Sequence, residues 1–189
     1  MTHEQTSLIQ KLQADTTLTA NAKATLIEWI EQGKHVPVDR PSWDEYWLMF
    51  TEAAAKRSID SQFQVGAVIV DKRQHIQAVG YNAFPSGIED KFLPNIRPEK
   101  YPWMIHAELN AILNCEHKPR GSTLYCNCHP CLPCFLVIAQ SGISEVVYST
   151  IKRAKMLDEK ADTNLAIAKW LLRDKVIVRA HQLEGKDNG

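Results

Sequence analysis

The stretch of sequence from residue 106 to residue 134 begins with His106-Ala107-Glu108 and ends with Pro130-Cys131-Leu132-Pro133-Cys134. A histidine and two cysteines in a C-x-x-C step supply three ligands for one zinc ion. Three protein ligands leave a fourth position for water, which is typical of catalytic zinc sites. Glu108 is not needed as a ligand, and it can carry protons to and from that water. The stretch therefore predicts a catalytic zinc site with His106, Cys131 and Cys134 as ligands and Glu108 as the acid–base.

The same stretch indicates the fold, because its composition alternates between helix and strand. Residues 106–113 have helical composition, residues 123–126 are expected to form a strand, and a second helix is expected over residues 131–140. If both motifs start helices, their first turns can converge on one ion, and the helix N-termini favour the negative thiolates. The pattern continues with a strand at 145–149, a helix at 163–173 and a strand at 175–180.

A hairpin is expected upstream of the two motifs. Residues 65–70 form a compact apolar run of β-branched type, typical of a strand covered on both sides. A turn at residues 71–74 leads into a second strand at 76–81. A hairpin followed by alternating helices and strands predicts an α/β fold, an αβα sandwich around one mixed sheet of about five strands.

A further helix is expected just before the hairpin. Ser42 and Glu45 form a capping box, which marks a helix N-terminus. Apolar residues then recur at spacings of three and four, and they predict the buried face of this helix: Trp43, Tyr46, Trp47, Phe50 and Ala54.

The first forty residues are expected to form a helical extension. Two short amphipathic helices are predicted within residues 4–33, and Gly33 is expected to end the second. Pro37 and Pro41 indicate an extended linker. The predicted organisation is an N-terminal helical extension and linker (1–40), the α/β domain (41–182) and a flexible tail (183–189). The extension is expected to pack against the domain or an oligomer partner, with a lid over the site as the alternative.

Composition and charge narrow the class of protein. The chain has 189 residues, of which 44% are hydrophobic and 23% charged, as in an ordinary globular domain. Lysine plus arginine and aspartate plus glutamate are balanced at 22 each. A dedicated nucleic-acid binder usually has a basic excess, so this balance argues against a nucleic-acid partner.

Cysteine usage and the N-terminus bear on the compartment. Four of the five cysteines lie between Cys126 and Cys134, which suits metal binding in a reducing cytosol better than a disulfide framework. The residues from Met1 to Gln5 have neither a basic region nor an apolar core, so no secretory signal is expected. No apolar run approaches the length of a membrane span. A cytoplasmic protein without a membrane partner is therefore expected.

Taken together, the two motifs follow the zinc deaminase pattern, H-x-E followed by P-C-x-x-C. Several other segments match as well, and the chain resembles the deoxycytidylate (dCMP) deaminase-type members of the zinc-dependent cytidine deaminase superfamily. The resemblance covers roughly residues 42–150 and is carried by these pieces: Val65–Val70, Gly80–Gly87, His106–Ile112, Tyr125, Pro130–Cys134, Ser141–Ile143 and Val146–Tyr148.

The resemblance implies a cytidine deaminase-like fold, one catalytic Zn²⁺ and hydrolytic conversion of dCMP to dUMP with release of ammonia. It also implies a homo-oligomer. By the same match, Asn82 would contact the sugar and the backbone at Ala107 would face the base. Tyr101 and Trp103 precede the zinc histidine, and their flat rings could stack on the pyrimidine, with packing of the loop against the sheet as the alternative.

Other substrates and another class of protein stay open. Many relatives carry an arginine before the first strand of the domain, where residues 61–64 read Ser-Gln-Phe-Gln. A guanidinium fits phosphate oxygens, so its absence leaves dCTP or free (deoxy)cytidine as alternative substrates. Ala83 stands where many relatives have glycine, which argues against regulation by dCTP and dTTP. A polynucleotide deaminase and a non-catalytic zinc-stabilised binding module are the further alternatives.

Two groups of residues near the motifs could have either a structural or a functional role. Cys126 or Cys128 could supply a fourth ligand to a structural zinc site, or both could bind a second metal with His129; burial as small core residues is favoured. Cations in the long loop could clamp a phosphate, although a solvated face is favoured for all three: Lys91, Arg97 and Lys100.

Overall fold

The computed structural model describes residues 1–34, 40–152 and 159–181, and the chain divides into two compact units, residues 1–40 and 41–189. The first unit is a pair of packed helices, α1 (His3–Ala14) and α2 (Ala20–Glu31), as predicted. Ile9 and Ile30 are buried in this unit. Pro37 and the expected tail at 183–189 lie outside the described residues.

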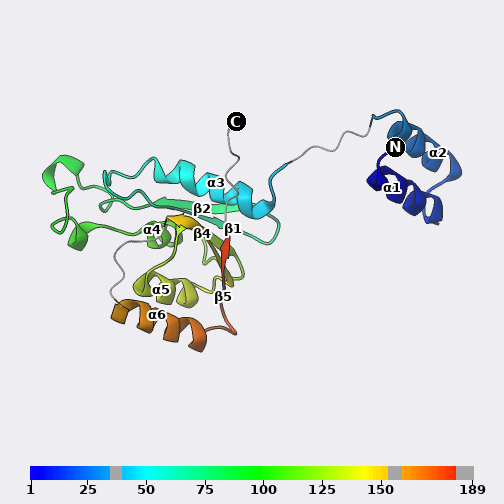
Figure 1. The fold of residues 1–189 in the computed structure, drawn as a ribbon. Coiled ribbons are helices and arrows are strands. Elements are labelled where there is room, and N and C mark those ends of the chain that lie inside the picture. Colours follow the sequence, from blue (N-terminus) through cyan, green and yellow to red (C-terminus); the bar gives the residue numbers. More distant parts are fainter. Residues whose placement is uncertain (35–39, 153–158, 182–189) are drawn as a thin grey trace. The chain divides into compact units, whose positions relative to one another are not determined.

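The second unit is built on a mixed sheet, which the described residues form from five strands in the order β2-β1-β3-β4-β5. The central antiparallel part comprises β1 (Gly66–Val70), which pairs with both β2 (Ile76–Tyr81) and β3 (Thr123–Cys128). Beyond β3 the sheet is parallel, through β4 (Glu145–Lys152) and β5 (Ile177–His181) (Figure 1). The predicted hairpin and the mixed five-stranded sheet are confirmed.

Helices cover both faces of this sheet, so the αβα sandwich is confirmed. One face carries α3 (Trp43–Ala55), and the other carries α4 (Ala107–Leu113), α5 (Leu132–Ser141) and α6 (Glu159–Leu171). The long loop between β2 and α4 contains two short 3-10 turns, η1 (Asp90–Phe92) and η2 (Tyr101–Trp103). No helix among the residues described is both long and apolar enough to cross a membrane.

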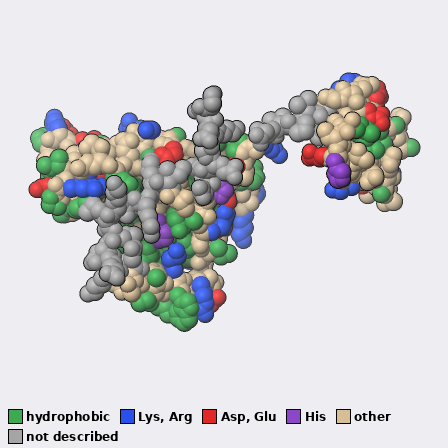
Figure 2. All heavy atoms as spheres, viewed as in Figure 1, with side chains coloured by type: hydrophobic (Ala, Val, Ile, Leu, Met, Phe, Trp, Pro, Cys, Tyr) green, Lys and Arg blue, Asp and Glu red, His purple; other side chains and the backbone are tan. Residues whose placement is uncertain are grey.

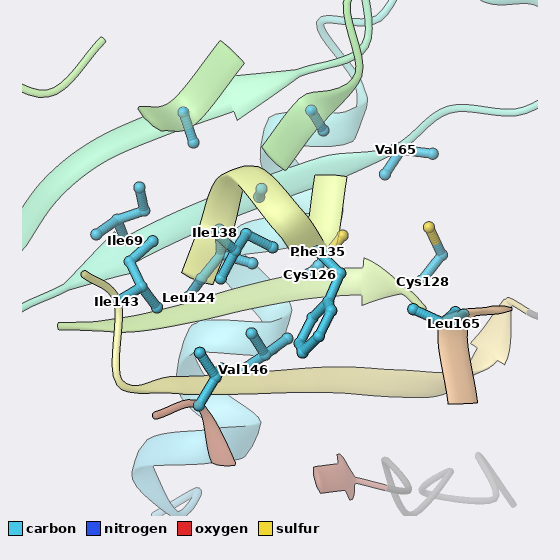
Figure 3. Close-up of a cluster of buried hydrophobic side chains, with 14 of the residues drawn as sticks. Val65, Ile69, Leu124, Cys126, Cys128, Phe135, Ile138, Ile143, Val146 and Leu165 are labelled. Atoms are coloured by element: carbon cyan, nitrogen blue, oxygen red, sulfur yellow. The ribbon is translucent and has the colours of Figure 1, made fainter. Parts of the chain in front are cut away.

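The larger hydrophobic core lies between the sheet and the α4–α5–α6 layer. Phe135 and Ile138 of α5 pack there against Leu124 of β3 and Val146 of β4 (Figure 3). Cys126 and Cys128 belong to the same core. A smaller core under α3 contains Trp47, Leu48, Val68, Val70, Tyr125 and Val147.

The predicted buried face of α3 is partly wrong. Trp47 and Ala54 are buried as predicted, but Trp43 is 57% exposed and Phe50 is 38% exposed. The other buried positions are Leu48, Thr51 and Ala55. The reason is close packing: a Cβ at Gly66 would lie 2.0 Å from the Thr51 carbonyl oxygen, so α3 approaches β1 through its small residues. The aromatic residues lie beside this contact and stack on one another, with the Trp43 and Trp47 rings 6.0 Å apart.

Candidate metal and active site

The two motifs lie at the N-termini of two neighbouring helices. His106 is the N-cap residue of α4, and Cys131 is the N-cap residue of α5, both with extended backbone. Cys134 follows in the first turn of α5. The prediction that both motifs start helices is confirmed. The positive end of each helix dipole therefore faces the sulfur atoms and stabilises a thiolate.

The three predicted ligands converge. His106 Nδ1 lies 3.4 Å from the Sγ atoms of both Cys131 and Cys134, and the three ligand atoms all lie within 4.8 Å of one another. A tetrahedral zinc site with Zn–S of about 2.3 Å and Zn–N of about 2.0–2.1 Å separates sulfur from nitrogen by about 3.5 Å. The donor set and its spacing therefore fit one zinc ion held by three protein ligands.

Proton sharing between the two cysteines favours ionisation of Cys131 and opposes that of Cys134, whose pKa the hydrogen bond with Cys131 raises well above its usual value. Hydrogen bonding from Cys134 lowers the pKa of the Cys131 thiol to about 4, against the opposing effect of burial, and a hydrogen bond to His106 acts in the same direction. The thiolate is the form of cysteine that binds metals. The hydrogen bond with Cys131 in turn raises the pKa of the His106 imidazole. Among the described residues, these three form the group of side chains that could hold a metal ion.

Glu108 lies beside the ligand group without belonging to it. The side chain follows His106 by two residues in the first turn of α4, is 3% exposed, and lies close enough to the Cys134 thiol for each group to shift the pKa of the other. Burial raises the pKa of its carboxyl group. A raised pKa makes the carboxyl a better proton acceptor than an exposed glutamate, as an acid–base residue requires.

The helix that carries Glu108 lies directly on the sheet because of Gly80 on β2. A Cβ at this position would lie 2.3 Å from both the Ala107 carbonyl oxygen and the Ala111 amide nitrogen. Asn110 adds a second tie, since its side-chain amide donates to the Tyr81 carbonyl oxygen at 2.8 Å. The position of the Glu108 carboxyl is therefore set by backbone contact between α4 and β2.

Gly80→Ala is expected to destabilise the domain by about 1–3 kcal/mol, because the added methyl meets helix backbone that cannot rotate away. The same shift should move Glu108 and lower kcat. Urea unfolding measures the first effect. Gln77→Ala, at an exposed position of the same strand, is the control and should stay within about 0.5 kcal/mol of the wild type. An unchanged unfolding free energy for Gly80→Ala would show that α4 can shift without cost.

Asn82 lies next to His106 across a short backbone bridge. Ala83 and Ile105 exchange hydrogen bonds at 3.1 and 2.8 Å, which closes the long loop at its base. The Asn82 side chain is buried, accepts from the Val65 amide at 2.8 Å and donates to the Phe63 carbonyl oxygen at 3.0 Å. The bridge thus places Asn82 opposite His106, and its contact with a sugar stays a prediction.

The other predicted substrate residues are placed as follows. Ala107 is fully buried as the first residue of α4, with its backbone at the helix N-terminus. Tyr101 and Trp103 form η2 and are 43% and 47% exposed. Both rings are thus open to solvent at the end of the loop that leads into His106. Their stacking on a base stays a prediction.

The prediction of a solvated face is wrong for Lys100. Its side chain is 1% exposed, and Nζ lies 2.6 Å from Oδ1 of Asp60. Asp60 also bonds to the Asn82 amide nitrogen at 3.3 Å, so the pair belongs to the surroundings of the site. Sequence analysis missed Asp60. Its short polar side chain in Ser58-Ile59-Asp60-Ser61 was the available signal, since aspartate in such a segment often binds nearby backbone amides.

Cys126 and Cys128 lie where the favoured interpretation put them, in the larger hydrophobic core. His129 packs edge-on against the Tyr148 ring, with centroids 4.5 Å apart. Its Nδ1 lies 2.8 Å from the Pro130 carbonyl oxygen and its Nε2 3.3 Å from Lys169 Nζ. These contacts hold the His129 ring on the segment that leads into Cys131.

Residues 41–150 match the sequence profile of the cytidine and deoxycytidylate deaminase zinc-binding region. The human deoxycytidylate deaminase is 38% identical over 141 residues, which cover 71% of this chain and 75% of that protein. The deoxycytidylate deaminase of Mycobacterium phage D29 is 38% identical over 125 residues, which cover 59% of this chain and 97% of that protein.

Solved structures show the same fold. The apo dCMP deaminase of cyanophage S-TIM5 superposes with a TM-score of 0.57 and 26% identity, over 75% of this chain and 99% of that one. The same phage enzyme in complex with dCMP and dUMP superposes equally well, with a TM-score of 0.57 and 24% identity, over 76% and 100% of the two chains.

Proposed function

The chain belongs to the cytidine and deoxycytidylate deaminase family, and from this premise we propose that it hydrolyses dCMP to dUMP and ammonia with one bound Zn²⁺. Curated relatives at 38% identity are deoxycytidylate deaminases. The metal is zinc, in keeping with the family's zinc-binding region and with the His/Cys/Cys group. Its ligands in this proposal are His106, Cys131 and Cys134.

One observation carries the proposal of an enzyme rather than a binding module. Glu108 is buried beside the ligand group, close to Cys134, and its pKa is raised by burial. Burying a carboxyl group costs free energy, and a zinc site that only braced the fold would gain nothing from it. A structural site would also bind zinc with four protein ligands rather than three.

Zinc, when bound, lowers the pKa of a coordinated water from about 15.7 towards 7, which supplies hydroxide at neutral pH. Glu108 accepts the proton that this ionisation releases. The same carboxyl donates this proton to the ring nitrogen as hydroxide adds to the carbon that bears the amine. It then takes the remaining proton of the added hydroxyl and passes it to the amine, because an amine leaves as ammonia only once it is protonated, and the oxygen stays on the ring as a carbonyl. One residue thus acts first as base and then as acid, which its buried position next to Cys134 permits.

The nucleotide is proposed to lie across the N-terminus of α4. The first N–H groups of a helix have no partner within it, so the Ala107 amide can donate to the base. Asn82, next to His106 across the Ala83–Ile105 bridge, is proposed to contact the sugar. Tyr101 and Trp103, both exposed in η2, are proposed to cover the base.

Ammonia release from a panel of zinc-loaded reactions tests this proposal. The panel comprises deoxycytidine, dCMP, dCTP, CMP and single-stranded DNA, and dCMP is expected to show the highest kcat/KM. A higher kcat/KM for dCTP or deoxycytidine would move the assignment to the triphosphate or the nucleoside. No ammonia from any of the five would overturn the enzyme assignment.

We also propose a homo-oligomer in the cytoplasm. All five cysteines of the chain lie among the described residues and are free thiols, as suits a reducing compartment.

Hydrophobic side chains gather over the C-terminal end of α6, where Trp170 and Leu171 are 64% and 63% exposed (Figure 2). A second subunit would cover such a surface. Light scattering should therefore give a molar mass at least twice the 21.4 kDa of one chain, and a mass of one chain would contradict the oligomer.

A further inference from the structure

A buried ion pair joins two segments far apart in the sequence. Lys100 Nζ lies 2.6 Å from Asp60 Oδ1, and the two side chains are 1% and 6% exposed. Removing two charges from water costs free energy that the attraction between them recovers only when further hydrogen bonds satisfy both groups. A buried pair is therefore weak evidence for stability, and the contacts around it show what else it does.

Asp60 satisfies this condition through its neighbours on the segment before β1. Its Oδ1 also accepts from the amides of Gln62 at 2.8 Å and Phe63 at 2.9 Å. Burial alone would raise the pKa of Asp60, but the hydrogen bonds from Lys100, Gln62 and Phe63 outweigh it, and the pKa lies below its usual value. The ammonium of Lys100 donates in addition to Gln62 Oε1 at 3.1 Å. Asp60 is thus a carboxylate held in one orientation.

The second oxygen of Asp60 fixes the amide of Asn82. Asn82 Nδ2 donates to Asp60 Oδ2 at 3.3 Å and to the Phe63 carbonyl oxygen at 3.0 Å, while its Oδ1 accepts from the Val65 amide. Both N–H bonds of the amide are therefore occupied, and one lone pair of Oδ1 stays available. In this orientation Asn82 can accept a hydrogen bond from a hydroxyl group but cannot donate one.

Lys100 connects this arrangement to the turn that precedes the zinc histidine. It is the N-cap residue of η2, and its carbonyl oxygen accepts from the Trp103 amide at 3.1 Å. The ion pair therefore ties the turn that carries Tyr101 and Trp103 to the segment that orients Asn82. The two sets of residues proposed to meet the base and the sugar are held together through Asp60 and Lys100.

We propose that Asp60 and Lys100 are positioning residues for the substrate: they orient the Asn82 amide as an acceptor for the sugar hydroxyl and hold η2 over the base. This inference rests on the proposed function. Neither side chain needs to touch the nucleotide, because each acts through Asn82 or through η2.

The double variant Asp60→Asn/Lys100→Met separates positioning from stability. Removing both charges leaves no lone buried ion, so the domain should fold. The new amide at position 60 has one acceptor oxygen where the carboxylate had two. If that oxygen keeps the bonds from the Gln62 and Phe63 amides, the N–H groups face the Asn82 amide and can no longer accept from it. If the oxygen faces Asn82 instead, the bonds from Gln62 and Phe63 are lost. We expect the KM for dCMP to rise about tenfold or more, with kcat within about threefold, which is the pattern of lost uniform binding. Zinc content should equal that of the wild type.

The preference for a substrate with the 3′-hydroxyl over one without it can be measured directly. This preference should not change if Asp60 and Lys100 only stabilise the fold. The wild type should prefer dCMP over its 2′,3′-dideoxy analogue, and the double variant should lose most of this preference. Lys100→Arg keeps the charge but not the ammonium geometry, and it should shift the same preference less. Arg73→Met removes a surface partner of Asp71 in the hairpin turn and is the control, with unchanged KM and preference.

The outcomes are distinguishable. A lower unfolding temperature with unchanged KM and unchanged sugar preference, in the double variant and in Lys100→Arg, would make the pair purely structural and overturn the inference. If the double variant does not fold, the sugar preference of Lys100→Arg decides in the same way. No turnover of dCMP by the zinc-loaded wild type would overturn the proposed function, and this inference with it.

Discussion

Replacing Glu108 with glutamine is expected to lower kcat for dCMP by about 10²–10⁴-fold, the range that proton transfer by a positioned side chain contributes. Glutamine has nearly the same shape as glutamate, so it can occupy the buried position in the first turn of α4. It cannot take up the proton that the reaction requires. Steady-state ammonia release measures the loss.

Zinc content is the companion measurement for Glu108→Gln. Since Glu108 lies outside the group of three ligands, the variant should keep about one zinc ion per chain. Glu116→Gln, at an exposed position in the loop after α4, is the matched control and should leave kcat unchanged. Bound zinc with unchanged turnover in Glu108→Gln would show that another group carries the proton.

Cys131→Ala is expected to abolish both zinc binding and turnover. Loss of a direct ligand should reduce zinc affinity by more than the roughly 10–100-fold that changes to outer-shell partners cause. Because ligand binding to the folded state stabilises it, the wild type should also melt at a lower temperature after chelation, and the variant should not respond. Elemental analysis and thermal melts with and without chelator measure the two effects.

Cys115→Ala provides the control for this variant. Cys115 is half-buried after the end of α4, packs against the larger core and takes no part in the ligand group. Its loss should leave zinc content at the wild-type value. Full zinc occupancy in Cys131→Ala would mean that the ligand set has been assigned wrongly, with Cys126 or Cys128 as the next candidates.

The sequence predicted those parts of the structure whose cause is local. His106 and Cys131 could be placed at helix N-termini because each precedes a run of helical composition, and helix geometry then brings Cys134 to the same side as Cys131. The β1–β2 hairpin followed from two apolar runs and the turn between them. The ligand group could be predicted because all three residues depend on the first turns of two helices.

The parts that could not be predicted depend on contacts between distant segments. The buried face of α3 is set by Gly66, where the helix backbone touches β1, and the helical period of the aromatic residues carries no information about that contact. Lys100 looked solvated because lysines in polar loops usually are. Its partner Asp60 lies forty positions away, and no local pattern pairs them.

The Ala83–Ile105 bridge has a consequence for how this enzyme could change over evolutionary time. Two backbone hydrogen bonds hold the ends of the loop together, independently of the side chains between them. Insertions, deletions or exchanges between those ends leave Asn82 and His106 adjacent, so the chemistry can stay constant while the loop residues change. The fold should therefore tolerate a loop from a relative that acts on another nucleotide, provided that Lys100 is kept. The residues between Ala83 and Ile105 are thus the segment to exchange when the substrate is to be changed.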